Sequence, residues 1–183
     1  MPIVVRRIAG QIVPPVIVDV VTAIRTPRSK LIKPGELERA VEFAARKISG
    51  RGGIIVVLDG DDDCPAQIGP ALLKRAANAR NDLPIAVIIA KREFEAWFIA
   101  AAESLADQIG LPTGLEAPVN PEDIRGAKEW LTERMQGNRG YSASLDQPTL
   151  ASLFDMQLAL RADSFEKFHR TIKQLLSDVP DAD

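Results

Sequence analysis

Four of the five residues from Asp59 to Asp63 are aspartates, and Gly60 is the fifth. Like charges this close repel one another, so the cluster is costly unless a cation or basic groups neutralise it. Asp59 and Asp61 lie two residues apart and can both reach one hard cation, while Gly60 lets the backbone turn sharply. The pattern predicts a metal site in which Asp59, Asp61 and Asp63 bind Mg²⁺ or Mn²⁺.

A helix N-terminus is the competing interpretation of the same cluster. Asp62 and Asp63 precede Pro65, and carboxylates at such a position cap a helix and interact well with its dipole. This interpretation explains Asp63 fully and Asp62 in part. It leaves Asp59 and Asp61 unexplained, so those two carry the metal hypothesis.

The rest of the sequence narrows the kind of metal site. Cys64 and His169 are the only cysteine and histidine, which excludes a disulfide within the chain, a thiolate zinc site and a multi-histidine site. Oxygen must therefore hold any metal, which favours magnesium, manganese or calcium. An EF-hand loop would need Gly and Glu where Cys64 and Pro70 stand, and no Gly-rich phosphate loop is present.

A second group of reactive side chains follows the next apolar run. Lys91 and Arg92 could bind phosphate, and Glu95 could supply a third carboxylate as an accessory ligand or base. Helix-start chemistry explains Glu95 equally well, because acids favour a first helical turn, and Trp97 reads as a core residue.

Charge is distributed unevenly along the chain. Residues 1–50 hold nine Lys or Arg and four acids, for +5, so the remainder is −7 in a chain of net charge −2. Arg6 and Arg7 in this basic quarter could contact the phosphates of a nucleic acid, although solvated helix faces account for the same excess. No signal peptide and no bilayer-spanning apolar run is visible, so we expect a cytoplasmic protein.

The elements that must position these residues alternate in type. We predict strands at residues 16–24, 54–58 and 84–90, separated by helices beginning near residues 34 and 65, with a third helix over 93–108. This order predicts βαβ units, a parallel sheet and helices on its faces. In such sheets ligands bind beyond the carboxyl ends of the strands, where both groups fall. Residues 1–12 could be a helix or a strand.

The character of the chain changes after residue 110. Residues 111–121 are rich in Pro, Gly and Asn, and three helical stretches follow, at 122–136, at 148–160 and from residue 163. We therefore predict an α/β core at residues 1–109 and a helical extension at 110–183 that packs on it.

These segments resemble a bacterial family catalogued as domain-of-unknown-function family 4276, which is related to Toprim domains. The resemblance covers most of the chain and rests on residues 58–64, 93–97, Lys128, 140–142 and 163–168. It implies a Toprim-like three-layer parallel sheet, an Asp-x-Asp metal site matched by Asp59 and Asp61, and phosphodiester chemistry on nucleic acid. It also implies a place in phage defence, often beside a partner ATPase.

The N-terminus departs from the pattern that the resemblance implies. Such proteins usually begin with a strand and a Val-Glu-Gly segment that carries the glutamate of the site. Residues 1–7 look like the helix after that segment. Either the reading frame starts farther upstream, or this member has lost the site.

Three functions are therefore open. The first is a Toprim-like, magnesium-dependent nuclease or phosphotransfer protein, inactive if the glutamate is lost. The second is a non-catalytic partner subunit of a defence or DNA-processing complex. In both cases the protein could be an oligomer. The third, a small-molecule phosphatase or a receiver-like aspartate site, is disfavoured because phosphatases of the haloacid type place Asp-x-Asp at the first strand, with Thr or Val soon after.

Overall fold

Two parallel strands form the sheet of the computed structural model, which describes residues 1–21, 23–137 and 139–177. β1 (Ile54–Asp59) pairs with β2 (Ile85–Ala90), in a register that sets Asp59 opposite Ala90. Both strands are the unbroken apolar runs predicted from the sequence, and such runs are typical of strands buried on both faces. The protein is thus of mixed α/β class, with a small parallel sheet.

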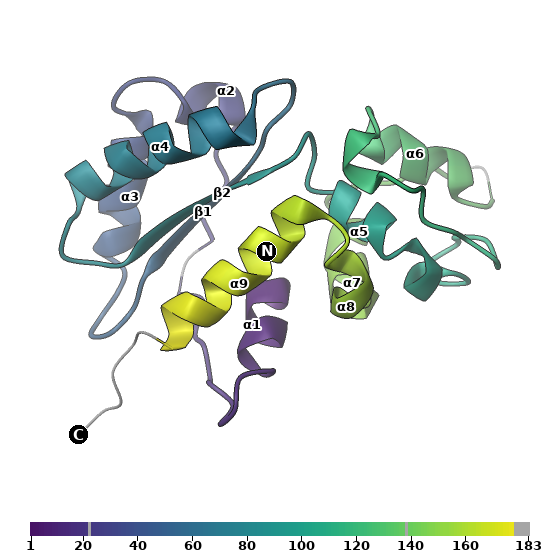
Figure 1. The fold of residues 1–183 in the computed structure, drawn as a ribbon, viewed down its shortest axis with the longest axis horizontal. Helices are drawn as coiled ribbons and strands as arrows, with labels where there is room; N and C mark the ends of the chain where they lie inside the picture. Colours follow the sequence, from purple (N-terminus) through teal and green to yellow (C-terminus); the bar gives the residue numbers. More distant parts are fainter. Residues whose placement is uncertain (22, 138, 178–183) are drawn as a thin grey trace.

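Helices cover both faces of this sheet (Figure 1). On one face lie α2 (Arg28–Leu31), α3 (Glu36–Ala45) and α4 (Pro65–Ala79), and on the other lie α1 (Pro2–Ala9) and α9 (Asp163–Ser177). Successive side chains of a strand point to opposite faces. Val87 and Ile89 accordingly join the core under α3 and α4, whereas Ile88 and Ala90 join the core that contains α1 and α9.

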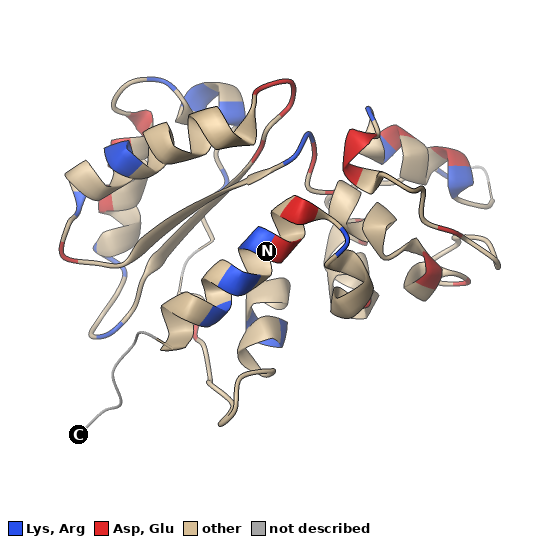
Figure 2. Ribbon diagram, viewed as in Figure 1, with Lys and Arg blue, Asp and Glu red and all other residues tan. Residues whose placement is uncertain are grey.

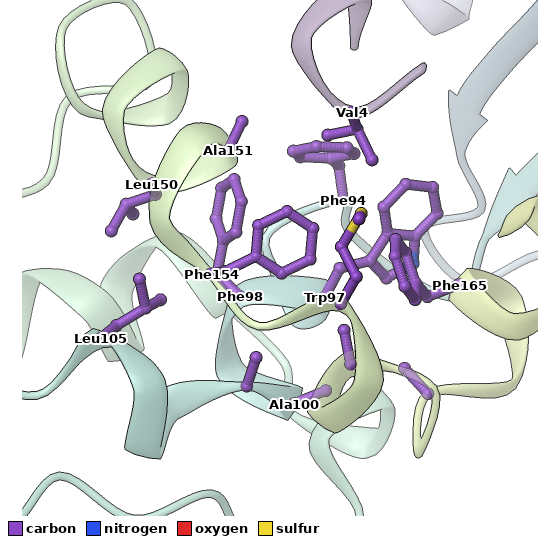
Figure 3. Packing of buried hydrophobic residues seen from close by; sticks show 14 of the residues in the cluster. Val4, Phe94, Trp97, Phe98, Ala100, Leu105, Leu150, Ala151, Phe154 and Phe165 are labelled. Atoms are coloured by element: carbon purple, nitrogen blue, oxygen red, sulfur yellow. The ribbon is translucent and has the colours of Figure 1, made fainter. Parts of the chain in front are cut away.

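The remaining helices gather beyond the carboxyl ends of the strands (Figure 1). They are α5 (Ala96–Ala100), η1 (Ala102–Leu105), η2 (Pro121–Asp123), α6 (Ala127–Arg134), α7 (Asp146–Leu153) and α8 (Met156–Ala159). Their core is aromatic. It contains the fully buried rings of Trp97, Phe98, Phe154 and Phe165, which meet edge to face (Figure 3). This one cluster draws residues from both sides of residue 110.

The strand predicted at residues 16–24 is wrong. The described residues of this segment lie in no helix or strand, although Val16, Val18 and Val20 are half-buried while Ile17, Asp19 and Val21 are exposed. That alternation is typical of a strand. A strand also needs a hydrogen-bonded neighbour, and among the described residues no backbone bond joins the segment to β1.

Several predicted helices are shorter or interrupted. Residues 93–108 form α5 and then the 3₁₀ turn η1, where the Ser104 hydroxyl donates to the Ala101 carbonyl at 2.6 Å. Residues 148–160 break at Asp155, whose carboxylate caps α8 by accepting from the Gln157 N–H at 2.7 Å. Residues 1–12, left open by the sequence, begin with helix α1.

Within the described residues, no helix is both long enough and apolar enough to span a bilayer.

An ion pair between α3 and α4 makes stability depend on pH in a way that can be measured. Arg75 donates two hydrogen bonds to the Glu38 carboxylate, at 2.7 and 2.9 Å. These bonds lower the pKa of Glu38 from 4.5 to about 2. The pair therefore stabilises the fold above the unfolded pKa, and its contribution is lost as the pH falls toward about 2.

We expect Glu38→Gln to lower the free energy of unfolding at neutral pH by at most about 1 kcal/mol, because the pair is partly exposed. The difference from the wild type should shrink steadily in urea titrations below the ordinary carboxyl pKa. A difference that stays constant with pH would contradict this assignment.

Candidate functional site at the carboxyl end of the strands

The loops after β1 and β2 are joined by backbone hydrogen bonds. The Gly60 N–H donates to the Ala90 carbonyl at 2.8 Å, and the Asp61 N–H donates to the Arg92 carbonyl at 3.0 Å. A Cβ on Gly60 would lie 3.0 Å from the Ala90 oxygen, so the close approach of the two loops requires glycine there. The parallel register thus brings the two predicted groups of reactive side chains to one edge of the sheet, as expected.

Asp59 is the most enclosed aspartate of the cluster. One of its carboxylate oxygens accepts the Phe94 N–H at 2.8 Å, which leaves the second oxygen for another partner. Burial raises the pKa of Asp59, and the Glu95 and Glu93 carboxylates raise it further. The Phe94 N–H and the Lys128 ammonium act in the opposite direction but do not cancel the rise.

Arginines neutralise the other three aspartates. Arg28 donates to the Asp59 backbone carbonyl at 2.7 Å, pairs with Asp61 at 3.3 Å and also pairs with Asp63. Asp62 pairs with Arg92 at 3.1 Å and with Arg125 at 2.7 Å. The expectation that a cation or basic groups must offset the cluster is therefore met, in this structure, by guanidinium groups.

Glu95 is the buried centre of a partly exposed polar network whose charges act on Asp59. Its side chain is 1% exposed. The carboxylate accepts one hydrogen bond from the Tyr141 hydroxyl at 3.0 Å and a second from the Gln147 side-chain amide at 3.4 Å. The Lys128 ammonium lies 3.2 Å from Glu95 and 2.6 Å from Glu93. Burial first, and then the Glu95 charge, raises the pKa of Tyr141, so the phenol keeps its proton and donates to the carboxylate.

Lys128 is held in place by two carboxylates. Burial alone would lower its pKa, but Glu93 and Glu95 together outweigh that effect and raise it, so the ammonium stays charged. Glu93 is fixed in turn, because its other oxygen accepts the Ala127 N–H at 3.0 Å at the start of α6. A positive charge is therefore fixed next to the buried Glu95 and near enough to Asp59 to lower its pKa.

The four predicted phosphate-binding residues lie in two places: Lys91 and Arg92 on the loop after β2, and Arg6 and Arg7 on α1. Lys91 pairs with Asp123 at 2.8 Å, and Arg92 takes a left-handed backbone conformation with φ 61° beside Asp62. Arg7 donates to the Ala151 and Phe154 carbonyls at 2.9 and 2.8 Å, and Arg6 is exposed on α1. Within the described ranges, no ion pair or hydrogen bond links Arg6 or Arg7 to residues 59–63.

Figure 2 shows the acidic loop after β1 and the basic residues after β2 at the end of the sheet nearest to the remaining helices. Among residues 1–21, 23–137 and 139–177, no three acidic, histidine or cysteine side chains gather closely enough to hold a metal by themselves. The predicted three-ligand group of Asp59, Asp61 and Asp63 is therefore not assembled, because the Asp61 and Asp63 carboxylates form ion pairs with Arg28.

Sequence reasoning missed several members of this site. The sequence pattern predicted no role for Arg28, Tyr141, Gln147 or Lys128. Lys128 and Tyr141 did belong to the segments that carried the family resemblance, and that was the available signal for them.

A family profile matches residues 9–173, which is most of the chain. The chain belongs to the family described as Domain of unknown function (DUF4276). The match spans β1, β2, the network around Glu95 and nearly all of α9, so the whole site lies within the family domain. Comparison with curated proteins and with solved structures finds no match.

Proposed function

We propose that this DUF4276 chain is a bacterial, Toprim-related protein that handles phosphodiesters of nucleic acid with the help of a divalent cation. One observation carries the proposal. Asp59 lies at the carboxyl end of a parallel strand, in front of a buried Glu95 whose charge is compensated by a fixed Lys128. Ligand sites of open parallel sheets are found at this edge. Helices on both faces of the sheet are compatible with a Toprim-like layered core.

The donor set fits magnesium or manganese. The Phe94 N–H occupies only one of the two Asp59 carboxylate oxygens, so the other could bind a cation. The Asp61 side chain is 61% exposed and so can be reached from solvent. Magnesium commonly takes one or two protein carboxylates and completes its shell with water, so a ready three-ligand group is not required. When bound between Asp59 and Asp61, the cation would polarise a phosphodiester and lower the pKa of a bound water.

The chain's own groups supply the rest of the proposed chemistry. Lys128 places a permanent positive charge beside the site, and Glu95 and Glu93 hold it there. Arg92 and Lys91 lie on the adjoining loop, where guanidinium and ammonium groups can bind phosphate oxygens. Glu95 itself is enclosed by Tyr141, Gln147 and Lys128, so it acts by positioning rather than as a metal ligand.

Calorimetric titration with Mg²⁺ and Mn²⁺ tests the proposal. We expect binding by the wild-type chain and its loss in the Asp59→Asn, Asp61→Asn double variant. Asp107→Asn is the matched control, because Asp107 is also exposed and also has a positive φ, 62° against 49° for Asp61. Arg28→Gln should bind the cations more tightly, since Arg28 then no longer competes for Asp61. Equal binding by all four chains, or by none, would reject the metal site.

A non-catalytic subunit is the second candidate function. It is favoured by the guanidinium groups of Arg28, Arg92 and Arg125, which already neutralise the acidic loop without a metal. In this case the chain would serve a phage-defence or DNA-processing complex, for example beside an ATPase subunit. Failure of every chain to bind a cation is the result that would favour it.

A further inference from the structure

Arg28 contacts three residues of the acidic loop at once. Its Nε donates to the Asp59 backbone carbonyl at 2.7 Å, Nη1 lies 3.3 Å from the Asp61 carboxylate, and Nη2 pairs with Asp63. The side chain is only 18% exposed. Arg28 begins α2 and lies 31 residues before Asp59 in the chain, so the tertiary structure brings this guanidinium to the carboxyl end of β1.

The surroundings of α2 fix the position of Arg28. Leu31 of α2 is buried in the core under α3 and α4. Arg75 of α4 donates to the carbonyls of Ile32 and Lys33, directly after α2, both at 2.8 Å. The loss of one carboxylate partner would therefore not carry Arg28 away from the end of β1.

Arg28 differs from the other arginines at the loop in the aspartate that it neutralises. Arg92 and Arg125 both pair with Asp62, which is not a ligand in the proposed cation site. Arg28 pairs with Asp61, which is one of the two proposed ligands. A bound cation therefore competes with Arg28 for a carboxylate and leaves the partners of Arg92 and Arg125 unchanged.

Such competition would free one end of the Arg28 guanidinium and keep the other end in place. Nη1 loses the Asp61 carboxylate to the cation. The bond from Nε goes to the backbone carbonyl of Asp59 rather than to its carboxylate, so it persists. A guanidinium that is anchored at Nε and open at a terminal nitrogen, next to a cation, is well suited to phosphate oxygens.

Charge balance favours the same order of binding. Among the described residues, the interacting side chains around the loop are six carboxylates (Asp59, Asp61, Asp62, Asp63, Glu93 and Glu95) and four cations (Arg28, Arg92, Arg125 and Lys128). The neighbouring pair of Lys91 and Asp123 adds no net charge. With every carboxylate ionised, the group carries two excess negative charges, which repel a phosphodiester and which one divalent cation balances.

We propose that Arg28 binds a phosphate of the nucleic acid and becomes available for it when a divalent cation occupies Asp59 and Asp61. The inference rests on the proposed function, because it needs the cation site. It makes the two binding events cooperative: the cation raises the affinity for the phosphodiester, and the phosphodiester raises the affinity for the cation by the same factor.

Fluorescence anisotropy with a labelled DNA oligonucleotide, single-stranded and duplex, tests the proposal. The readout is the gain in DNA affinity on going from EDTA to saturating Ca²⁺, an oxygen-liganded cation like Mg²⁺. Calorimetry first verifies that each chain binds Ca²⁺, and Mg²⁺ replaces it if only Mg²⁺ binds. We expect Arg28→Gln to reduce the gain of the wild-type chain by about tenfold, which corresponds to about 1.4 kcal/mol of coupling.

Two further variants separate this role from general charge and from folding. Arg125→Gln is the matched control, because Arg125 pairs with the same loop through Asp62, and it should leave the gain unchanged. Arg28→Lys keeps the charge without the planar fork and should lower the gain by a smaller factor. If Arg28→Gln does not fold, Arg28→Lys carries the test, and an unchanged gain in that chain then overturns the proposal.

The results that overturn the inference differ from those that reject the cation site. An equal gain in the wild-type and Arg28→Gln chains, both binding the cation, removes the role of Arg28 and leaves the cation site intact. An equal loss of gain in Arg125→Gln shows a general charge effect and also overturns the inference, as does a lack of DNA binding under both conditions. Failure of the wild-type chain to bind any divalent cation rejects the proposed function and this inference together.

Discussion

Replacement of Lys128 by methionine should destabilise the fold by about 2 kcal/mol, less than the roughly 3–5 kcal/mol lost when a fully buried ion pair is broken, because the Lys128 side chain is 41% exposed. Methionine keeps the length of the side chain and removes its charge. Glu95, 1% exposed, and Glu93 would then face each other without a compensating cation. Burial disfavours an unpaired carboxylate strongly, so the loss exceeds that of a surface pair.

Two companion variants separate charge from packing at Lys128. Lys128→Arg keeps a cation and should recover most of the stability. Adding Glu95→Gln to Lys128→Met should also recover part of it, because the buried group is then neutral and can still accept from Tyr141. Urea unfolding followed by circular dichroism gives the free energies. If Lys128→Met stays within about 0.5 kcal/mol of the wild type, as ordinary surface changes do, the network does not bear on stability.

Truncation of Trp97 to alanine should cost about 3–5 kcal/mol. The indole is fully buried, and its ring centroid lies 4.8, 5.2 and 5.1 Å from those of Phe94, Phe165 and Phe168. Its N–H donates to the Ser164 hydroxyl at 2.7 Å, which in turn donates to the buried Glu122. Alanine would therefore leave a cavity in the aromatic cluster (Figure 3). It would also weaken the polar chain between α5, η2 and α9.

The other tryptophan of the chain is the natural control. Trp130 is only half-buried and stacks with Arg134 on α6, so Trp130→Ala should cost about 1 kcal/mol. Trp97→Phe should be milder than Trp97→Ala, and a double-mutant cycle with Ser164→Ala would isolate the hydrogen bond. Similar losses at Trp97 and Trp130 would contradict the assignment of Trp97 as the centre of the aromatic core.

Part of the site could be predicted from sequence because it depends on local pattern. The apolar runs that became β1 and β2 end directly before Asp59 and Lys91, and parallel pairing then brings the two loops to one edge. Burial of Trp97 in the core was predicted in the same way, from its place on a helical apolar face. The metal and phosphate roles assigned to these residues stay predictions.

What the sequence alone determined is the α/β class, the two buried strands, the acidic loop at their carboxyl end and the start of α9. Tertiary structure decided the partners of that loop, because Arg28 and Asp63, Glu93 and Lys128, and Glu95 and Tyr141 lie 35, 35 and 46 residues apart. It also decided that segment 16–21 stays unpaired beside β1. Propensity can make a segment extended, but only a neighbouring backbone makes it a strand.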